Sequence, residues 1–251
     1  MTEYRLVTIP VSHYCEKARW ALDRLGLAYT EDGHLPFGHF RATLGLSPKR
    51  SVPVLVRGHE VWPDSTDILQ HLDTRAPVGL RLYPEAAALR KEVETLEDLF
   101  DEKLGPAVRR WAYFHLLPHR TLAERVVGTG APAIERRAMR LLFPLARQVL
   151  RRALNITPET AEKSRVRMVA LFDEVSARLQ DGRRFLVGDR FTAADLTFAS
   201  LAAVALLPPE APVLRMDLTD LPASMRPDVE RLRATPAGQF ALRMYAEQRK
   251  P

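Results

Sequence analysis

The pattern of apolar and polar positions changes once along this chain. Short apolar runs separated by turn residues occupy the first part, and the run Leu6–Ile9 is typical of a buried strand. After about residue 85, apolar residues recur every three or four positions, as in the stripe Leu89, Val93 and Leu96. Such spacing is typical of amphipathic helices. The pattern therefore predicts a mixed α+β domain followed by an all-helical domain.

The first strand runs directly into a helix. Pro10 ends the apolar run, and helical spacing begins at Cys15, so Ser12 lies at the junction. The first N–H groups of a helix have no partner within it and, with the helix dipole, they stabilise a thiolate or another anion. Ser12 and Cys15 are three residues apart and can share one side of the first turn. Local evidence alone favours a plainer interpretation, with Ser12 as a helix cap and Cys15 as a small buried hydrophobic residue.

Two later stretches carry further signals. Val52-Pro53 stands at the mouth of an apolar strand, a position where proline is accepted. If the bond between them is cis, the backbone of Val52 turns outward, where an extended peptide can pair with it. Asp64-Ser65 then opens a helix. We expect Ser65 to be its N-cap and its free N–H groups to bind a carboxylate.

The order and separation of these motifs resemble those of the cytosolic glutathione S-transferase superfamily, in a bacterial-like serine/cysteine type. The resemblance implies a thioredoxin-like N-terminal domain with the order βαβ-α-ββα and an all-α helical-bundle C-terminal domain. The expected division is residues 1–76 for the first domain, 77–84 for a linker and 85–251 for the second. The helical part is longer than is usual in the family, with the surplus around residues 105–156.

The resemblance also assigns roles to residues. In the family, a Ser, Cys or Tyr near the first helix bonds the glutathione sulfur, which makes Ser12 and Cys15 the catalytic candidates. The valine before the cis-proline pairs with the cysteinyl backbone of glutathione. An acidic residue and a serine hold the γ-glutamyl end, and a cation often holds the glycyl carboxylate. The glutathione-binding candidates are Val52, Pro53, Asp64, Ser65, Lys49 and Arg50.

The sequence departs from the family pattern at three places. His13 replaces the common proline and adds a group expected to titrate near neutrality. Asp64 is one methylene shorter than the usual Glu or Gln. Ser12 replaces the first cysteine of the C-x-x-C motif of redox relatives, with Cys15 as the second, which removes the standard dithiol mechanism. A monothiol exchange reaction through Cys15 stays open as an alternative.

A second signature lies in the helical part. Thr192-x-x-Asp195 has the spacing of a capping box, in which each side chain satisfies the backbone N–H of the other residue. Asp195 is therefore expected to be a structural residue and not a catalytic acid. The segment closely resembles the capping motif of the core helix in the family's C-terminal domain, so the resemblance extends over the whole chain.

Composition narrows the functional classes. The single cysteine excludes an intrachain disulfide and fits a reducing compartment, and no secretory signal or bilayer-spanning run is visible. The net charge of +6 would suit a nucleic-acid partner, but the arginine pairs are scattered and alternate with acidic residues. We therefore expect neither nucleic-acid nor membrane partners. His34 and His39 lack ligands at metal-like spacing, so no metal site is predicted.

The leading hypothesis is a cytoplasmic, homodimeric glutathione transferase with a role in detoxification. Glutathione would be its co-substrate, and a small hydrophobic electrophile or a peroxide would be the acceptor. Ser12 would donate a hydrogen bond to the glutathione sulfur and lower its thiol pKa. The alternatives are thiol–disulfide exchange or deglutathionylation through Cys15, and a non-catalytic binding or scaffold protein. Another low-molecular-weight thiol could replace glutathione.

Overall fold

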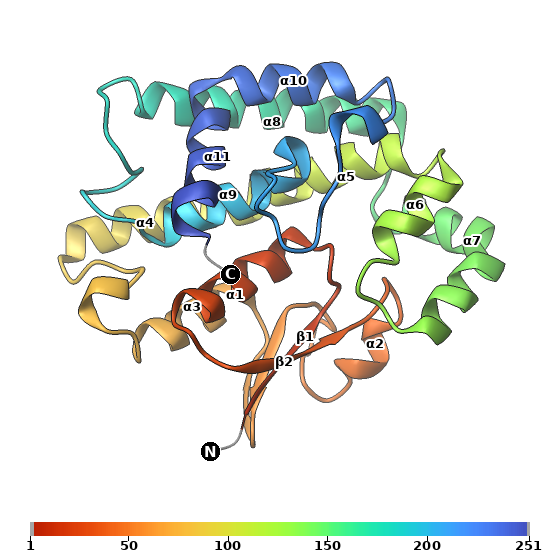
Figure 1. Cartoon of the computed structure of the whole chain (residues 1–251), viewed down its shortest axis with the longest axis horizontal. Coiled ribbons are helices and arrows are strands. Elements are labelled where there is room, and N and C mark those ends of the chain that lie inside the picture. Colours follow the sequence, from red (N-terminus) through yellow and green to blue (C-terminus); the bar gives the residue numbers. More distant parts are fainter. Residues whose placement is uncertain (1–2, 250–251) are drawn as a thin grey trace.

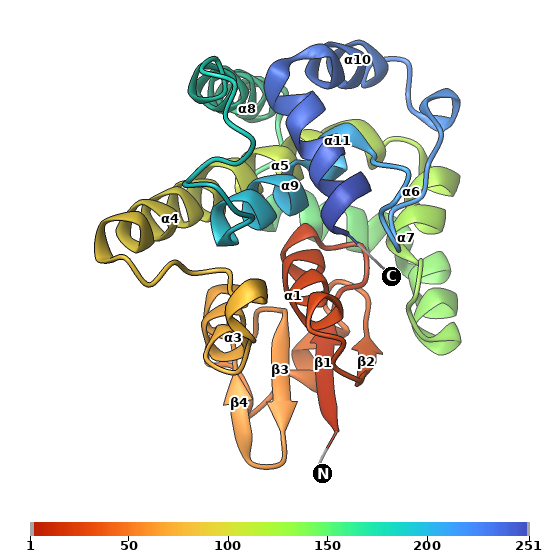
Figure 2. The same cartoon turned by 60° about the vertical axis from the view of Figure 1, so that its left-hand side comes forward.

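The N-terminal part of the protein is built on one mixed sheet. The computed structural model describes residues 3–249 of the chain. Its four-stranded sheet, at the bottom of Figure 1, has the order β2-β1-β3-β4 (Figure 2), with β1 parallel to β2 and antiparallel to β3. The strands are β1 (Tyr4–Thr8), β2 (Tyr29–Gly33), β3 (Val54–Arg57) and β4 (Glu60–Trp62).

Three helices complete this part. α1 (His13–Arg24) connects β1 to β2, α2 (His39–Ala42) precedes β3, and α3 (Ser65–Asp73) follows β4. Figure 2 shows α1 and α3 side by side above the sheet, between the strands and the remaining helices. Apolar side chains such as Leu6 and Leu55, which are paired in register and fully buried, join the core beneath them. The predicted thioredoxin-like order of elements is confirmed.

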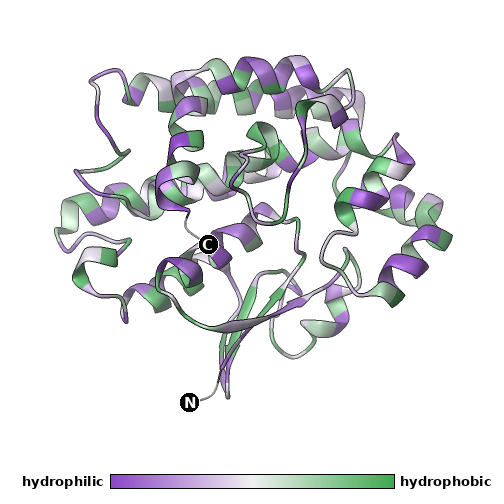
Figure 3. Ribbon diagram, viewed as in Figure 1, coloured by the Kyte–Doolittle hydropathy of each residue, from purple (hydrophilic) through white to green (hydrophobic). Residues whose placement is uncertain are grey.

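The rest of the chain is helical, as predicted. α4 (Ala87–Leu99), the π-helical turn η2 (Phe100–Leu104) and α5 (Gly105–Leu116) follow one another without a break and form one long rod. The other helices and short turns are η1 (Val78–Leu80), α6 (Arg120–Val127), α7 (Ala133–Ala153), α8 (Pro158–Arg178), α9 (Ala193–Leu206), η3 (Leu218–Asp220), α10 (Arg226–Ala234) and α11 (Pro236–Gln248). Hydrophilic and hydrophobic residues alternate along most of them (Figure 3).

α9 is the core helix of this second part. It is apolar on all sides and nearly every residue in it is buried, as is expected of a helix surrounded by other elements. The predicted capping box fixes its start, because the Thr192 N–H donates to Asp195 Oδ2 over 2.7 Å. Asp195 Oδ1 also accepts from the Leu186 N–H at 2.7 Å. The structural interpretation of Asp195 is therefore confirmed.

α6 and α7 form a hairpin beside the sheet domain, within the range 105–156 where the sequence predicts surplus length (Figure 1). α7 continues through Pro144 without an interruption. The turn before α7 lies against the β1–α1 junction: a Cβ atom on Gly33 would come within 2.9 Å of the Gly130 carbonyl oxygen and 2.8 Å of Pro10. The hairpin therefore adjoins the segment that carries Ser12.

Candidate active site

Ser12 occupies the N-cap position of α1, but its hydroxyl does not cap the helix. Its backbone is extended, at φ −74° and ψ 127°, and its N–H donates to the Ile9 carbonyl oxygen at 2.8 Å. No side-chain bond to the helix N–H groups is formed. The capping role that local evidence favoured is therefore wrong. Ser12 is half-buried, and its side chain instead lies against the Cys15 thiol at the positive end of the α1 dipole, where it can bind a ligand.

Cys15 faces the interior. Its side chain is fully buried, and burial raises the pKa of its thiol to about 12, although Arg19 and the nearby Ser12 hydroxyl act in the opposite direction. Only a thiolate is strongly nucleophilic. At neutral pH Cys15 is therefore a protonated, inaccessible thiol.

His13 differs from the sequence-based expectation. Its side chain is 5% exposed, and burial together with the Arg109 guanidinium lowers its pKa to about 3. The prediction that His13 titrates near neutrality is therefore wrong. Its pKa lies far below neutral pH, so the imidazole is uncharged at pH 7. Its ring bonds the backbone of Gly105, while Nε2 is buried and makes no hydrogen bond within residues 3–249.

A cavity of about 110 Å³ lies beside this junction. Ser12 and His13 form one wall, Arg109 and Tyr113 of α5 a second, and Val204 of α9 part of a third. The remaining lining is mostly aliphatic. A small apolar group with one polar atom fits such a space. Its polar atom could form a hydrogen bond with His13 Nε2, which is otherwise buried without a partner among the described residues.

The backbone of Val52 lies next to this junction. Val54 is opposite Val7 in the antiparallel pair of β3 and β1, so the residues before Val54 lie beside the end of β1. The Val52–Pro53 bond is cis. In the part of the chain that the structure describes, neither the N–H nor the C=O of Val52 makes a hydrogen bond. An extended ligand could therefore pair with this residue.

The start of α3 forms the next part of the site. Asp64 is its N-cap, and Asp64 Oδ1 accepts from the Thr66 N–H at 2.9 Å. The prediction that Ser65 is the cap is wrong by one residue, because Asp64 and not Ser65 has the extended backbone of a cap. Ser65 is instead the first helical residue and is 3% exposed. The helix start can still receive a carboxylate.

Lys49 and Arg50 are exposed in the loop before Val52. The backbone of Arg50 bonds the ring of His39, which is buried and also accepts from the Phe37 N–H at 3.2 Å. His39 therefore holds this loop in place, and the two cations project from it.

A buried ion network escaped the sequence analysis. Lys17 is fully buried on α1, and its Nζ lies 2.7 Å from Glu97 and 2.6 Å from Asp101. It also donates to Thr66 Oγ1 at 3.1 Å, next to Ser65. The network joins α1, the start of α3 and the α4–α5 rod, so it positions two parts of the site. No local signal distinguishes Lys17 from a solvent-exposed lysine.

The described residues 3–249 offer neither a metal site nor a membrane-spanning helix. Among residues 3–249, no group of three or more His, Cys, Asp or Glu side chains is placed to hold a metal ion. None of the helices in this range combines the length and hydrophobicity needed to cross a bilayer.

Family models match both parts of the chain. The model of the glutathione S-transferase N-terminal domain matches residues 6–81, and that of the C-terminal domain matches residues 133–221. The chain belongs to the glutathione S-transferase superfamily. The matched ranges of this transferase-family chain include Ser12, Val52, Ser65 and Asp195. Residues 82–132 lie between them.

Solved structures share the fold at low sequence identity. A glutathione S-transferase from Rhodospirillum rubrum F11 is 22% identical over 98% of this chain and 99% of its own, with a TM-score of 0.57. A theta class enzyme from Xanthomonas axonopodis pv. citri, crystallised with glutathione bound, is 21% identical over 96% and 98%, with a TM-score of 0.59. The beta-etherase LigF from Sphingobium sp. strain SYK-6 is 19% identical over 97% and 99%, with a TM-score of 0.63. No curated protein matched.

Proposed function

We propose that this protein is a glutathione transferase that activates the glutathione thiol at Ser12. The observation that carries the proposal is the Ser12 hydroxyl, which is not used for capping and lines a cavity at the start of α1. The hydroxyl would donate a hydrogen bond to the sulfur, and the helix dipole would favour the thiolate. A reduction of about two units in the thiol pKa corresponds to roughly 2.7 kcal/mol of differential stabilisation.

The rest of glutathione would lie along the adjacent edge. The unpaired N–H and C=O of Val52 would bond its cysteinyl backbone, and the start of α3 at Ser65 would receive the γ-glutamyl carboxylate. Lys49 or Arg50 would pair with the glycyl carboxylate. The bound glutathione in the theta class relative supports this choice of thiol.

The acceptor would be a small electrophile in the cavity beside Ser12. The thiolate would attack its electrophilic carbon, forming a C–S bond as the leaving group departs with the bonding electron pair. The limited volume of about 110 Å³ and the aliphatic lining favour a compact, largely apolar acceptor. By resemblance to the family, we also propose that the protein acts as a homodimer in the cytoplasm, and sedimentation analysis would test the dimer.

The alternative mechanism through Cys15 has less support. Thiol–disulfide exchange needs an accessible thiolate, whereas Cys15 is fully buried and burial raises its pKa to about 12. The two mechanisms predict opposite results. If Ser12 is the catalytic residue, Ser12→Ala should impair activation of the thiol, whereas Cys15→Ala should leave it intact. If Cys15 is the catalytic residue, Cys15→Ala should impair the reaction and Ser12→Ala should leave it intact.

The first experiment is calorimetric titration of the wild-type protein with glutathione at neutral pH. We expect binding in the micromolar to millimolar range. Ser65→Ala should weaken it, whereas Thr74→Ala, at the opposite end of α3, should not. Wild-type protein without glutathione affinity would refute the proposed co-substrate and favour another thiol or a scaffold role.

The second experiment measures the pKa of the bound thiol from its thiolate absorption. Ser12→Ala should raise this pKa and slow conjugation of a test electrophile. Binding without turnover in the wild type would favour the non-catalytic alternative. An unchanged pKa and rate in Ser12→Ala would refute the role of Ser12.

A further inference from the structure

The outer side of α7 carries a stripe of exposed apolar residues. Its five large side chains are between 41% and 82% exposed, and together they form the α7 stripe: Ile134, Leu141, Leu142, Leu145 and Val149. They are half of the ten large apolar side chains that are exposed within residues 3–249. From Ile134 to Val149 the stripe is about 22 Å long. Single exposed apolar residues are ordinary on a protein surface, whereas a contiguous stripe marks an interaction surface.

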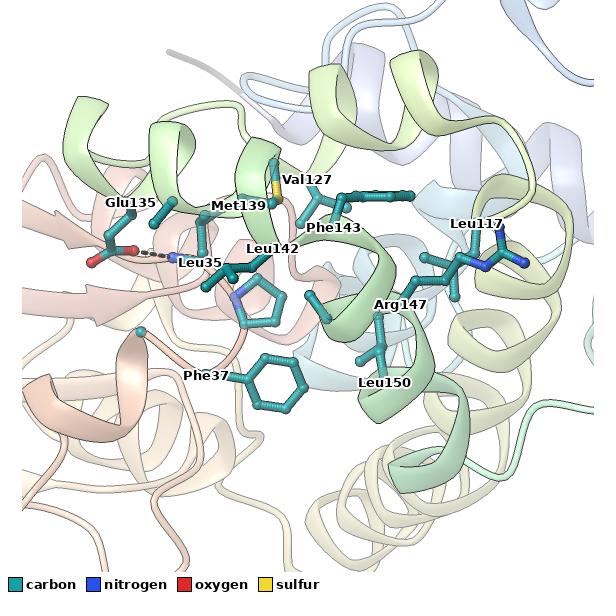
Figure 4. A pocket seen from close by; sticks show the side chains of 14 residues that line it. Leu35, Phe37, Leu117, Val127, Glu135, Met139, Leu142, Phe143, Arg147 and Leu150 are labelled. Atoms are coloured by element: carbon teal, nitrogen blue, oxygen red, sulfur yellow. Dashed lines mark hydrogen bonds between the residues drawn. The ribbon is translucent and has the colours of Figure 1, made fainter.

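The opposite side of α7 holds the helix on the protein. Phe143 is buried there, and Glu135 Oε2 accepts from the Leu35 N–H at 2.7 Å, the bond drawn in Figure 4. The same side borders a cavity of about 310 Å³ next to the segment Leu35–Gly38, and Leu142, at the edge of the stripe, also lines it (Figure 4). Contacts within the protein therefore fix α7 by one side. The α7 stripe faces outward, at the right-hand edge of the molecule in Figure 1.

α7 is also strongly basic. It contains one acidic residue, Glu135, and six arginines: Arg136, Arg137, Arg140, Arg147, Arg151 and Arg152. Six positive charges less one negative charge leave +5 on this helix, whereas the whole chain carries +6. The rest of the chain is therefore almost neutral, and nearly all of the net positive charge lies on α7.

Four of these arginines are available to a partner. The side chains of Arg137, Arg147, Arg151 and Arg152 make no hydrogen bond or ion pair with any of residues 3–249. At about 100° per residue, the α7 stripe covers an arc of about 100° of the helix, and Arg137 and Arg151 lie on the arc beside it. Basic side chains next to an apolar face are typical of a helix that lies in the interface of an anionic bilayer. The long arginine stems can place their charges at the level of the lipid phosphates.

We propose that α7 docks the protein on the surface of an anionic lipid bilayer. The α7 stripe enters the boundary between headgroups and acyl chains, and the free arginines bond the lipid phosphates. Charge favours this occupant over a second copy of the chain, because two α7 helices would bring twelve arginines and two glutamates together. The helix lies on the bilayer and does not cross it, which agrees with the lack of a spanning helix among residues 3–249. The sequence-based expectation of no membrane partner considered only spanning segments.

Flotation of the full-length protein with lipid vesicles tests the proposal. Vesicles that contain phosphatidylglycerol should bind the wild type at least tenfold more tightly than vesicles of phosphatidylcholine alone, because each arginine near an anionic surface contributes about fivefold. Binding should weaken as the salt concentration rises from about 0.1 M to about 1 M, since the Debye length falls from about 10 Å to about 3 Å. Absence of binding to the anionic vesicles, or equal binding to both kinds, would overturn the proposal.

A first pair of variants tests the apolar contact. Leu141→Gln/Leu145→Gln interrupts the α7 stripe at two exposed positions and should weaken binding to the anionic vesicles at least tenfold. The matched control Val78→Gln/Val166→Gln changes two exposed apolar residues outside α7 and should bind like the wild type. Sedimentation analysis follows the oligomeric state of both. Dissociation of an oligomer by the α7 variant without loss of vesicle binding would assign the stripe to a second copy and refute the bilayer contact.

A second pair tests the charges. Arg137→Gln/Arg151→Gln should weaken binding to the anionic vesicles at least tenfold and reduce its salt dependence. Arg75→Gln/Arg167→Gln removes the same net charge at exposed positions outside α7 and should have a much smaller effect. An equal loss in the two variants would show that net charge alone governs binding and would refute docking through α7. Circular dichroism checks that each variant is folded, and glutathione titration reports separately on the site at Ser12.

Discussion

Removal of the positive charge of Lys17 should destabilise the protein strongly. The Lys17 and Glu97 side chains are 0% and 1% exposed, and Asp101 is 19% exposed. In Lys17→Met the aliphatic stem still fills the space, but two carboxylates lose their counter-charge. Breaking a buried ion pair by removing one partner costs about 3–5 kcal/mol, because the remaining charge is left buried without compensation. We expect a loss of this size in the free energy of unfolding.

Urea and thermal unfolding would measure the effect. A change of this size lowers the midpoint temperature by roughly 6–20 °C in a chain of this length. Lys163→Met, on the exposed side of α8, is the matched control and should change stability by less than about 0.5 kcal/mol. Lys17→Met/Glu97→Gln should recover part of the loss, because one uncompensated charge is removed.

The pH dependence gives a second check. Burial raises the pKa of Asp101, while Lys17 acts to lower it. Without Lys17 this pKa rises further, so the folded state binds protons more readily than the unfolded state. Linkage then requires that the stability of the variant increases as the pH falls toward the ordinary carboxyl range. The deficit relative to wild type should be larger at pH 8 than at pH 5. A deficit below about 1 kcal/mol that does not vary with pH would refute this account of the network.

Two further predictions concern packing. Burial raises the pKa of Cys15 to about 12, so the native protein should react very slowly with a thiol reagent at pH 7 to 8. The urea-unfolded chain should react at once. Fast labelling of the native protein would contradict this burial. A Cβ atom on Gly238 would lie 1.9 Å from the Leu232 carbonyl oxygen. Gly238→Ala should therefore cost about 1–3 kcal/mol or more in unfolding experiments, despite the higher helix propensity of alanine. Gly79→Ala, with no atom nearby, should be close to neutral, and equal effects at both positions would contradict the close approach.

The features predicted correctly from the sequence are those fixed by local patterns. The strand–helix order of the first part follows from apolar periodicity, and the Thr192–Asp195 capping box needs only residues three positions apart. The cap of α3 was predicted one residue too late, because Asp64 and Ser65 are both good caps and only the backbone conformation selects between them.

The features that were missed depend on distant parts of the chain. His13 was expected to titrate near neutrality, but contacts from α5 bury it and lower its pKa. Lys17 was not singled out, because its partners Glu97 and Asp101 lie about eighty residues away. Burial and long-range charge pairing arise only in the folded chain, so the periodicity of one segment carries no information about them.

The α6–α7 hairpin has an apolar cluster of its own. Leu35, Val127 and Ala131 pack with Tyr113, Leu116 and Met139, separately from the main core around α9. A unit held by a few contacts can open without global unfolding, so its amide hydrogens should exchange at a lower free energy than those of α9. Because the hairpin packs separately from the core, substitutions in it can reshape the cavity beside Ser12, which Val126 and Val127 line, without repacking the capped core helix or the sheet.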